Sequence, residues 1–195
     1  MATKIGGEGA ASNCGVGGTY CLEDSGTSNI LFGSASCGDI STGTSFTPLA
    51  KTWYNIVATY NSIGSNYIYV NNKQDASGTV ALCNDAVNFQ MGSDGNADYL
   101  SGNIANLQLY DTSLTAAQIA QIYQSGIAGV PIASANIIGW WPLNGDANDY
   151  SGHIRRNGVA NSVSYPYFSG TYNSPGLSAI ATSANEWQAL GLANT

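Results

Sequence analysis

Acidic side chains gather in two loops of this 195-residue chain that are rich in glycine and asparagine. One loop carries Asp94 and Asp98, and a later loop carries Asp146 and Asp149. Calcium needs several hard oxygen ligands at about 2.3–2.6 Å, which carboxylate, amide and backbone carbonyl oxygens in a sharp loop supply. The alternative is that these side chains cap turns through nearby backbone amides. The residues favoured as ligands of a structural calcium ion are Asn144, Asp146 and Asp149, with Asp111 as a further contributor.

Residue types suited to catalysis are scarce. Glycosidases hold two carboxylates at about 5–9.5 Å across the scissile bond. The three glutamates are Glu8, Glu23 and Glu186, and they lack the alternate spacing that would present two of them from one strand. His153 is the only histidine, which disfavours Ser-His catalysis and a His-rich metal site and indicates a loop residue. We therefore expect no catalytic residues and no enzyme activity.

Cysteine usage indicates an oxidising compartment. The four cysteines lie in loop-rich sequence without the paired spacing or histidine partners of a zinc site, so two disulfides are expected and their pairing stays open. Buried free thiols are the alternative. These residues are Cys14, Cys21, Cys37 and Cys83.

Charge is low and negative. Charged residues make up 9% of the chain, against about 25% in an average protein, and the net charge is −7. Five basic residues cannot neutralise a path of phosphates, which argues against nucleic acid and anionic lipid as partners. Weak repulsion would instead tolerate close packing of many copies of the chain. The sequence has no apolar run of membrane-spanning length, and we expect no membrane insertion.

Alternating patterns predict antiparallel strands. Tyr54, Ile56, Ala58 and Tyr60 share one face of a strand that a turn near Gly64 connects to a return strand at 67–71. Further alternation predicts strands at 87–91 and 105–109, and a less regular hairpin at 19–23 and 29–32. The fold class is therefore all-β, an antiparallel meander with one covered face.

One helix interrupts the strands. Thr115 and Gln118 have the spacing of a capping box, and Leu114 and Ile119 that of a hydrophobic staple. Gly126 is placed to end the helix. We expect two to three helical turns, after which Ile137 begins a second apolar run.

Short motifs in a characteristic order accompany this helix. They are WYNIVATY at 53–60, YVNN at 69–72, MG at 91–92, GNI at 102–104, LYD at 109–111, LT at 114–115 and IAQIY at 119–123. In order and spacing they resemble the second half of a laminin-G-like (concanavalin A-like) jelly-roll domain, with Asn72 where that family commonly has glycine. The resemblance implies a β-sandwich, core positions for Trp53, Trp140 and Trp141, and a calcium ion near the acidic loops.

A second resemblance occurs at an unexpected position. GWWPLNG at 139–145, DYSG at 149–152 and NG at 157–158 resemble the opening strand and loop of the same family, yet they follow its usual end. We expect residues 1–130 to form the main part of the sandwich and residues 131–195 to complete it, in the same chain or in a neighbouring subunit. A truncated second repeat is the third explanation, although 131–195 is too short for a sandwich of about 100 residues.

The function expected from these features is a non-catalytic extracellular module of a surface protein, for adhesion to a cell-surface protein or for binding a glycan. Aromatic rings with nearby amides would form the sugar platform. The alternative is a structural subunit of an extracellular filament or coat assembled by strand exchange, and a glycoside hydrolase is disfavoured. The ligand-binding candidates are Tyr67, Tyr69 and Tyr99, with Tyr165 and Tyr167 also considered.

Overall fold

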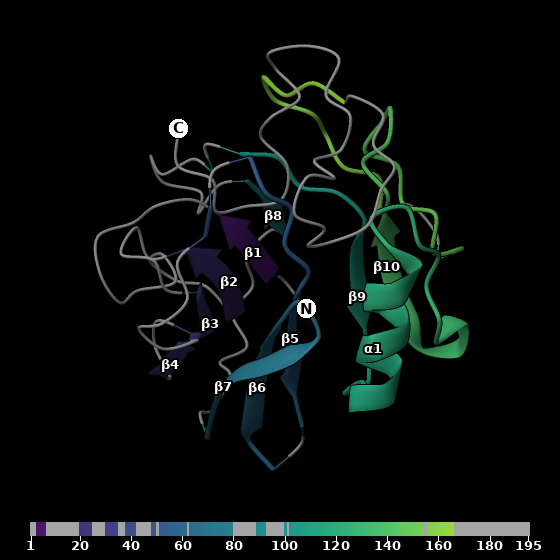
Figure 1. The fold of residues 1–195 in the computed structure, drawn as a ribbon. Coiled ribbons are helices and arrows are strands. Elements are labelled where there is room, and N and C mark those ends of the chain that lie inside the picture. The colour runs from purple at the N-terminus through teal and green to yellow at the C-terminus, as the bar shows by residue number, and fades with distance from the viewer. Residues whose placement is uncertain are drawn as a thin grey trace.

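In the described part of the computed structural model, strands dominate and one α-helix lies beside them (Figure 1). The structure describes residues 3–6, 20–24, 30–34, 38–41, 48–49, 51–61, 63–79, 89–92, 100, 102–153 and 156–165. The elements are β1 (Thr3–Gly6), β2 (Tyr20–Asp24), β3 (Ile30–Ser34), β4 (Gly38–Ser41), β5 (Ile56–Tyr60), β6 (Ser65–Val70), β7 (Lys73–Thr79), β8 (Gln90–Met91), β9 (Leu107–Tyr110), α1 (Ala116–Ser125), the 3₁₀ helix η1 (Ser134–Asn136) and β10 (Ile137–Trp141).

The strands form three sheets. One has the order β4-β3-β2-β1-β8, the second the order β5-β6-β7, and the third pairs β9 with β10. Neighbouring strands are antiparallel except that β1 runs parallel to both β2 and β8. The hairpin predicted at 19–23 and 29–32 is present as β2 and β3.

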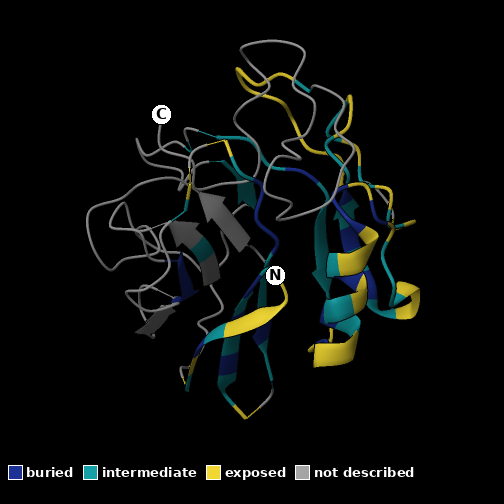
Figure 2. Ribbon diagram, in the orientation of Figure 1, coloured by how far each residue is buried: buried dark blue, intermediate teal, exposed yellow. Residues whose placement is uncertain are grey.

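The main core lies between two of these sheets. Phe32 of β3 packs in one cluster with Ile68 of β6 and Ala76 of β7. Ile56 and Ala58 of β5 pack against this cluster, as their alternate spacing predicts. The two sheets therefore face each other across apolar side chains, as in a sandwich, and Figure 2 shows buried segments on β3 and β6.

The opposite face of the β5-β6-β7 sheet is also covered, so the prediction of one covered face is wrong. Val57 and Tyr69 point away from Ile68 and pack against the buried side chains of α1. Tyr110 of β9 joins the same cluster. The helix thus packs against both this sheet and β9, because Val57 and Tyr69 give the second face of the β5-β6 hairpin apolar side chains as well. The buried side chains of this cluster are Leu114, Ile119 and Ile122.

The ends of α1 confirm the predicted signals. Thr115 accepts a hydrogen bond from the backbone N–H of Gln118, and the Gln118 side chain accepts one from the backbone N–H of Thr115. Gly126 forms the C-cap with a φ of 75°, a value that favours glycine. The helix has 10 residues, within the expected two to three turns.

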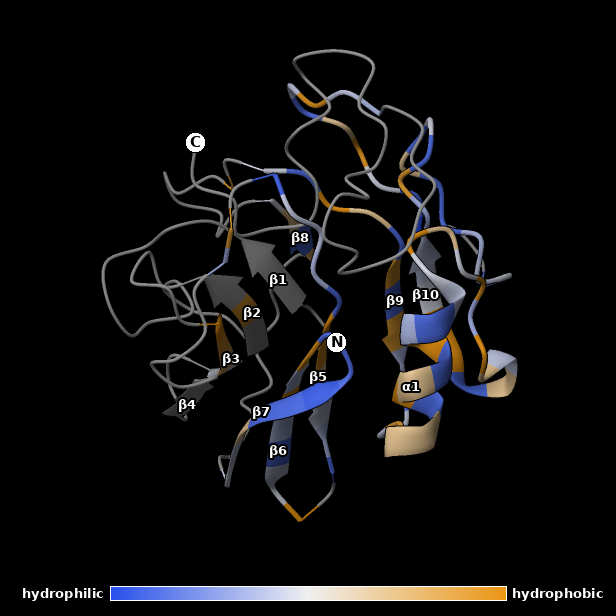
Figure 3. Ribbon diagram, in the orientation of Figure 1, coloured by the Kyte–Doolittle hydropathy of each residue, from blue (hydrophilic) through white to orange (hydrophobic). Residues whose placement is uncertain are grey.

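Four strands depart from the sequence prediction, which did not include β1, β4 or β7 and made β8 longer. β7 is a polar strand, exposed at its beginning, that alternation did not reveal (Figures 2 and 3). It forms because β6 offers it a free edge, and a shift of register occurs between Ile68 and Tyr69. Phe89 lies just before β8, which is only Gln90–Met91.

Candidate functional site

Among the described strands, β10 has a partner, β9, on one edge only, and the chain that follows β10 turns back along the other edge. We call residues 142–153 the edge loop. The backbone N–H of Trp140 donates to Asp149 Oδ1 at 3.0 Å, and the backbone N–H of Tyr150 donates to the carbonyl of Trp140 at 2.7 Å. Both outward-facing backbone groups of Trp140 are therefore satisfied by the edge loop, as those of an inner strand would be by a neighbouring strand.

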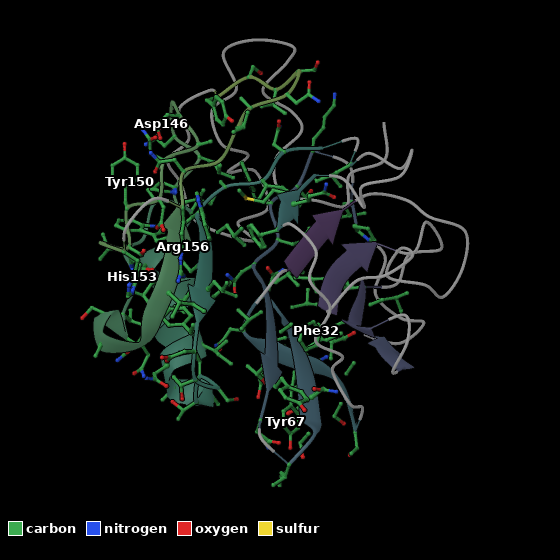
Figure 4. The ribbon with its side chains drawn as sticks, turned by 180° about the vertical axis from the view of Figure 1, so that it is seen from behind. Phe32, Tyr67, Asp146, Tyr150, His153 and Arg156 are labelled. Carbon is green, nitrogen blue, oxygen red and sulfur yellow. The ribbon has the colours of Figure 1, made fainter. Side chains whose placement is uncertain are left out.

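Two basic side chains cover the rest of this edge. His153 Nε2 lies 2.7 Å from the carbonyl oxygen of Ile137, and the Arg156 guanidinium donates to the carbonyl of Ile138. Figure 4 shows His153 and Arg156 along β10. Together with Asp149 and Tyr150, they leave little unpaired backbone on β10 for another strand to join.

The inner face of β10 is anchored in the apolar interior. Trp141 is 4% exposed, and its ring stacks on that of Phe89 with centroids 5.1 Å apart. Its indole N–H donates to the carbonyl of Arg156 at 2.9 Å. A Cβ on Gly139 would lie 2.3 Å from the Trp141 ring, so only glycine fits at position 139 without a shift. The family-implied core positions of Trp53 and Trp141 match their burial, whereas Trp140 is half-buried.

Trp140 points to the opposite face and is held by polar groups. Its indole N–H donates to Asn106 Oδ1 at 2.8 Å, and the Asn106 amide donates to the carbonyl of Gly129 at 2.8 Å. Gln108 donates to the same two oxygens, and it accepts a hydrogen bond from the Tyr110 hydroxyl at 2.6 Å. This polar ladder on β9 fixes the orientation of the Trp140 ring.

Tyr150 lies beside Trp140 at the surface. Its side chain is 54% exposed, and the two ring centroids are 6.2 Å apart with planes at 66°. The Tyr150 hydroxyl donates to Asp146 Oδ2 at 2.9 Å. We call Trp140 and Tyr150 the aromatic platform; Figure 4 shows Asp146 and Tyr150 close together beyond the end of β10.

Asp146 carries the charge beside this platform. The backbone and side-chain N–H groups of Asn148 donate to its two oxygens at 2.9 and 2.6 Å. The hydrogen bond from the Asn148 backbone is the main reason why the pKa of Asp146 is lowered. Burial raises the pKa of the Tyr165 hydroxyl, and the charge of Asp146 adds to that rise, so Tyr165 lies within electrostatic reach of the platform.

Of the predicted calcium ligands, Asp111 lies apart from the other three, which belong to the edge loop. Asp111 hydrogen-bonds with Asn136 at the start of β10, four strand residues or roughly 13 Å from the level of Asp149. Asp146 Oδ1 and Oδ2 and Asp149 Oδ1 already accept hydrogen bonds, and Asn144 is exposed. Among the described residues, no group of three or more acidic, His or Cys side chains is placed to hold a metal ion.

One oxygen of this loop remains without a partner. Asp149 Oδ2 is buried and accepts no hydrogen bond. Calcium takes about six to eight oxygen ligands, and a single orphaned oxygen does not meet that need. In the structure Asp146 and Asp149 act as hydrogen-bond acceptors that shape the edge loop, and calcium binding by this loop stays a prediction.

The other predicted site residues lie elsewhere. Tyr67 is half-buried on β6, far from β10 in Figure 4. Tyr69 packs against α1. Tyr99 and Tyr167, Asp94 and Asp98, and the side chains of the four cysteines lie outside the described residues, although Cys21 is placed in β2 opposite Gly33.

Sequence reasoning did not single out Tyr150. A signal was available, since Trp140 and Trp141 are consecutive in a strand and must point to opposite faces. One ring therefore had to leave the core, and the loop after it supplies a second aromatic residue.

A sandwich with a single capped helix is the architecture of a known class of binding domains. The family model of the concanavalin A-like lectin/glucanases superfamily, of the laminin-G type, matches residues 7–120, more than half of the chain. The chain belongs to this superfamily, and the predicted all-β sandwich with one short helix is confirmed. No curated protein and no solved structure matches the chain.

The match includes β2 to β9 and the first half of α1, but it ends before β10 and the edge loop. Domains of the laminin-G type are typically non-catalytic and are often extracellular, with roles in carbohydrate binding or adhesion, and many bind calcium. In the ranges described above, no helix is long and apolar enough to cross a bilayer.

Proposed function

We propose that this chain is a non-catalytic, extracellular carbohydrate-binding module of a surface protein, and that its glycan lies on the aromatic platform. The observation that carries this proposal is the exposed Tyr150 ring, set edge-on to Trp140 with its hydroxyl on Asp146. Aromatic faces cover the C–H faces of a sugar, while adjacent carboxylate and amide groups bind its hydroxyls. Asp146 and Asn148 supply those groups.

Preorganisation supports the same proposal. Trp140 is fixed by Asn106, and Tyr150 is fixed through both its backbone N–H and its hydroxyl. A ligand that binds to rings already held in place immobilises fewer side chains, and so loses less free energy on binding.

The domain organisation is part of the proposal. We infer that residues 131–195 complete, in the same chain, the sandwich that residues 1–130 begin. The antiparallel pairing of β10 with β9 supports this inference, as does the anchoring of Trp141 on Phe89. In this arrangement the platform is created where the two segments of the chain meet.

A glycan array probed with the purified protein tests the function. For the glycan bound best, Tyr150→Ala should weaken binding about thirtyfold, since a hot-spot tyrosine at the centre of an interface is worth about 2 kcal/mol or more. Tyr67→Ala is the matched control, because Tyr67 lies on β6 and should leave affinity unchanged. Loss of binding in the control alone would move the site to β6, and silence across the array would refute carbohydrate recognition.

A structural subunit of a filament or coat is the second candidate. The position of β10 beyond the family match favours it, because a strand outside the matched domain is the natural one to exchange. The covered outer edge of β10 opposes it. Light scattering over a range of concentrations separates the two: a monomer at high concentration excludes self-assembly, whereas long threads in electron micrographs would establish it.

A further inference from the structure

The chain contains two Asn-Gly pairs, Asn144-Gly145 and Asn157-Gly158, and both lie near β10. In such a pair the backbone nitrogen of glycine can reach the side-chain amide carbon of the preceding asparagine, because glycine has no Cβ to obstruct the approach. Ring closure requires that the glycine N–H and the asparagine side chain are both free to move. The two pairs differ in this respect.

Asn144-Gly145 is open. Both residues are exposed, and nothing lies within 4 Å of the point where a Cβ on Gly145 would be. Within the part of the chain that the structure describes, neither residue takes part in a hydrogen bond, whereas the next residue, Asp146, accepts several. The side chain of Asn144 and the amide of Gly145 are therefore free to rotate toward each other.

Asn157-Gly158 is locked. Asn157 Oδ1 accepts the backbone N–H of Asp149 at 3.0 Å, and the N–H of Gly158 donates to the carbonyl of Ala147 at 2.7 Å. A Cβ on Gly158 would lie 3.0 Å from that of Ala147, so the backbone is also closely packed. Ring closure there must break two hydrogen bonds that hold the edge loop in place.

We propose that Asn144 is a site of spontaneous covalent modification, converted through a cyclic succinimide to aspartate and isoaspartate. The Gly145 nitrogen bonds to Asn144 Cγ and loses its proton, the Cγ–Nδ2 bond breaks, and the side-chain nitrogen leaves as ammonia. Water then adds to either carbonyl of the ring and opens it. The net change is consumption of one water, release of one ammonia and gain of one carboxylate, with no oxidant or reductant.

The modification changes the loop that carries Asp146. A new negative charge appears two residues from that carboxylate, and the isoaspartate form lengthens the backbone by one methylene. Like charges at such short separation repel, so the edge loop would shift or Asp146 would bind protons more readily. The modified fraction of Asn144, next to the aromatic platform, therefore increases with the age of the protein, whether or not the platform binds a glycan.

Incubation of the folded protein in warm, mildly alkaline buffer tests this proposal. Trypsin cleaves after Arg155 and Arg156 and so separates Asn144 from Asn157. Mass spectrometry of the two peptides should show deamidation roughly tenfold or more faster at Asn144, since two hydrogen bonds protect Asn157. Labelling by an isoaspartate-specific methyltransferase should increase at the same rate.

Two controls make the result decisive. In concentrated urea the two pairs should react at similar rates, because both then lie in unfolded chain. Asn144→Gln should abolish the fast reaction of the folded protein, as glutamine forms the larger ring far more slowly. Equal rates at the two sites in the folded protein, or a faster reaction at Asn157, would overturn the proposal.

Discussion

The β5-β6-β7 sheet and the β9-β10 pair are held together by different means. In the sheet, five successive residues of β5 face five of β6, and side chains of alternating direction enter two apolar clusters. β10 has one partner strand, and its other edge is satisfied by the edge loop and by Arg156. At the β9-β10 pair, hydrogen bonds from the edge loop and from Arg156 thus take the place of a missing strand. In the β5-β6-β7 sheet, apolar burial dominates instead.

This difference determines which residues of each region can be substituted without loss of structure. A sheet stabilised by burial can change its surface residues freely, whereas β10 needs particular acceptors and donors at particular loop positions. The same loop residues present Asp146 and Tyr150 to solvent. The segment that covers the edge is therefore also the segment that builds the candidate surface.

Ile68→Ala tests how much apolar burial in the β5-β6-β7 sheet contributes to stability, and it should have the largest effect. Ile68 is fully buried between two sheets, and its truncation should lower the free energy of unfolding by about 2–5 kcal/mol. Urea titration measures the loss. Ile63→Ala is the matched control, since Ile63 is 80% exposed at the tip of the same hairpin and should change stability by less than about 0.5 kcal/mol.

Asp149→Ala tests how much the hydrogen bonds at the outer edge of β10 contribute to stability. It removes the acceptor for the backbone N–H groups of Trp140 and Ser151 and should cost about 1–3 kcal/mol of unfolding free energy. Asp111→Ala makes the same change where the carboxylate accepts only an exposed amide from Asn136. Equal losses in the two variants would show that sealing the edge of β10 contributes nothing.

Thr115→Ala tests whether the helix that packs against both regions depends on its capping box. Loss of the acceptor for the Gln118 N–H should cost about 1 kcal/mol, seen as a lower midpoint in thermal unfolding. The exposed Thr112→Ala provides the reference for loss of a threonine nearby. An equal shift of the unfolding midpoint in the Thr115→Ala and Thr112→Ala variants would show that the capping box does not stabilise the helix.

Asp146→Asn should have the smallest effect and one that depends on pH. Hydrogen bonds hold the pKa of Asp146 below its ordinary value of 3.8, so the folded state favours the charged form. That contribution is present above the unfolded-state pKa and is lost as the pH falls through the lower pKa of the folded state. The wild type should therefore lose more of its melting temperature than the variant below pH 3.8. Melting temperatures of the wild type and the variant that fall in parallel as the pH is lowered would contradict this expectation.

Local signals were sufficient for the helix and for the β2-β3 and β5-β6 hairpins. Thr115, Gln118 and Gly126 lie within one short segment, so their spacing alone predicts where the helix begins and ends. Alternation likewise predicted the β5-β6 hairpin. It failed for β7, whose residues are mostly polar and which forms because an adjacent strand has a free edge.

The candidate site was only partly predictable. The acidic residues of the edge loop were identified as calcium ligands, with turn capping through backbone amides as the alternative, and the structure shows them as acceptors for backbone and tyrosine donors. Contacts such as that of His153 with Ile137 join residues 16 apart in an irregular loop. No periodic pattern encodes where such a loop turns back, so Tyr150 could be placed beside Trp140 only in three dimensions.

The caps of α1 have a consequence for the surroundings in which this protein can fold. Thr115 and Gln118 satisfy the first turn and Gly126 ends the last one, with no acidic residue in the first turn and no basic residue in the last. Dissolved ions weaken attractions between charges at a helix end, but they have far less effect on neutral hydroxyl and amide pairs. The ends of such a helix should therefore depend little on the salt concentration around it.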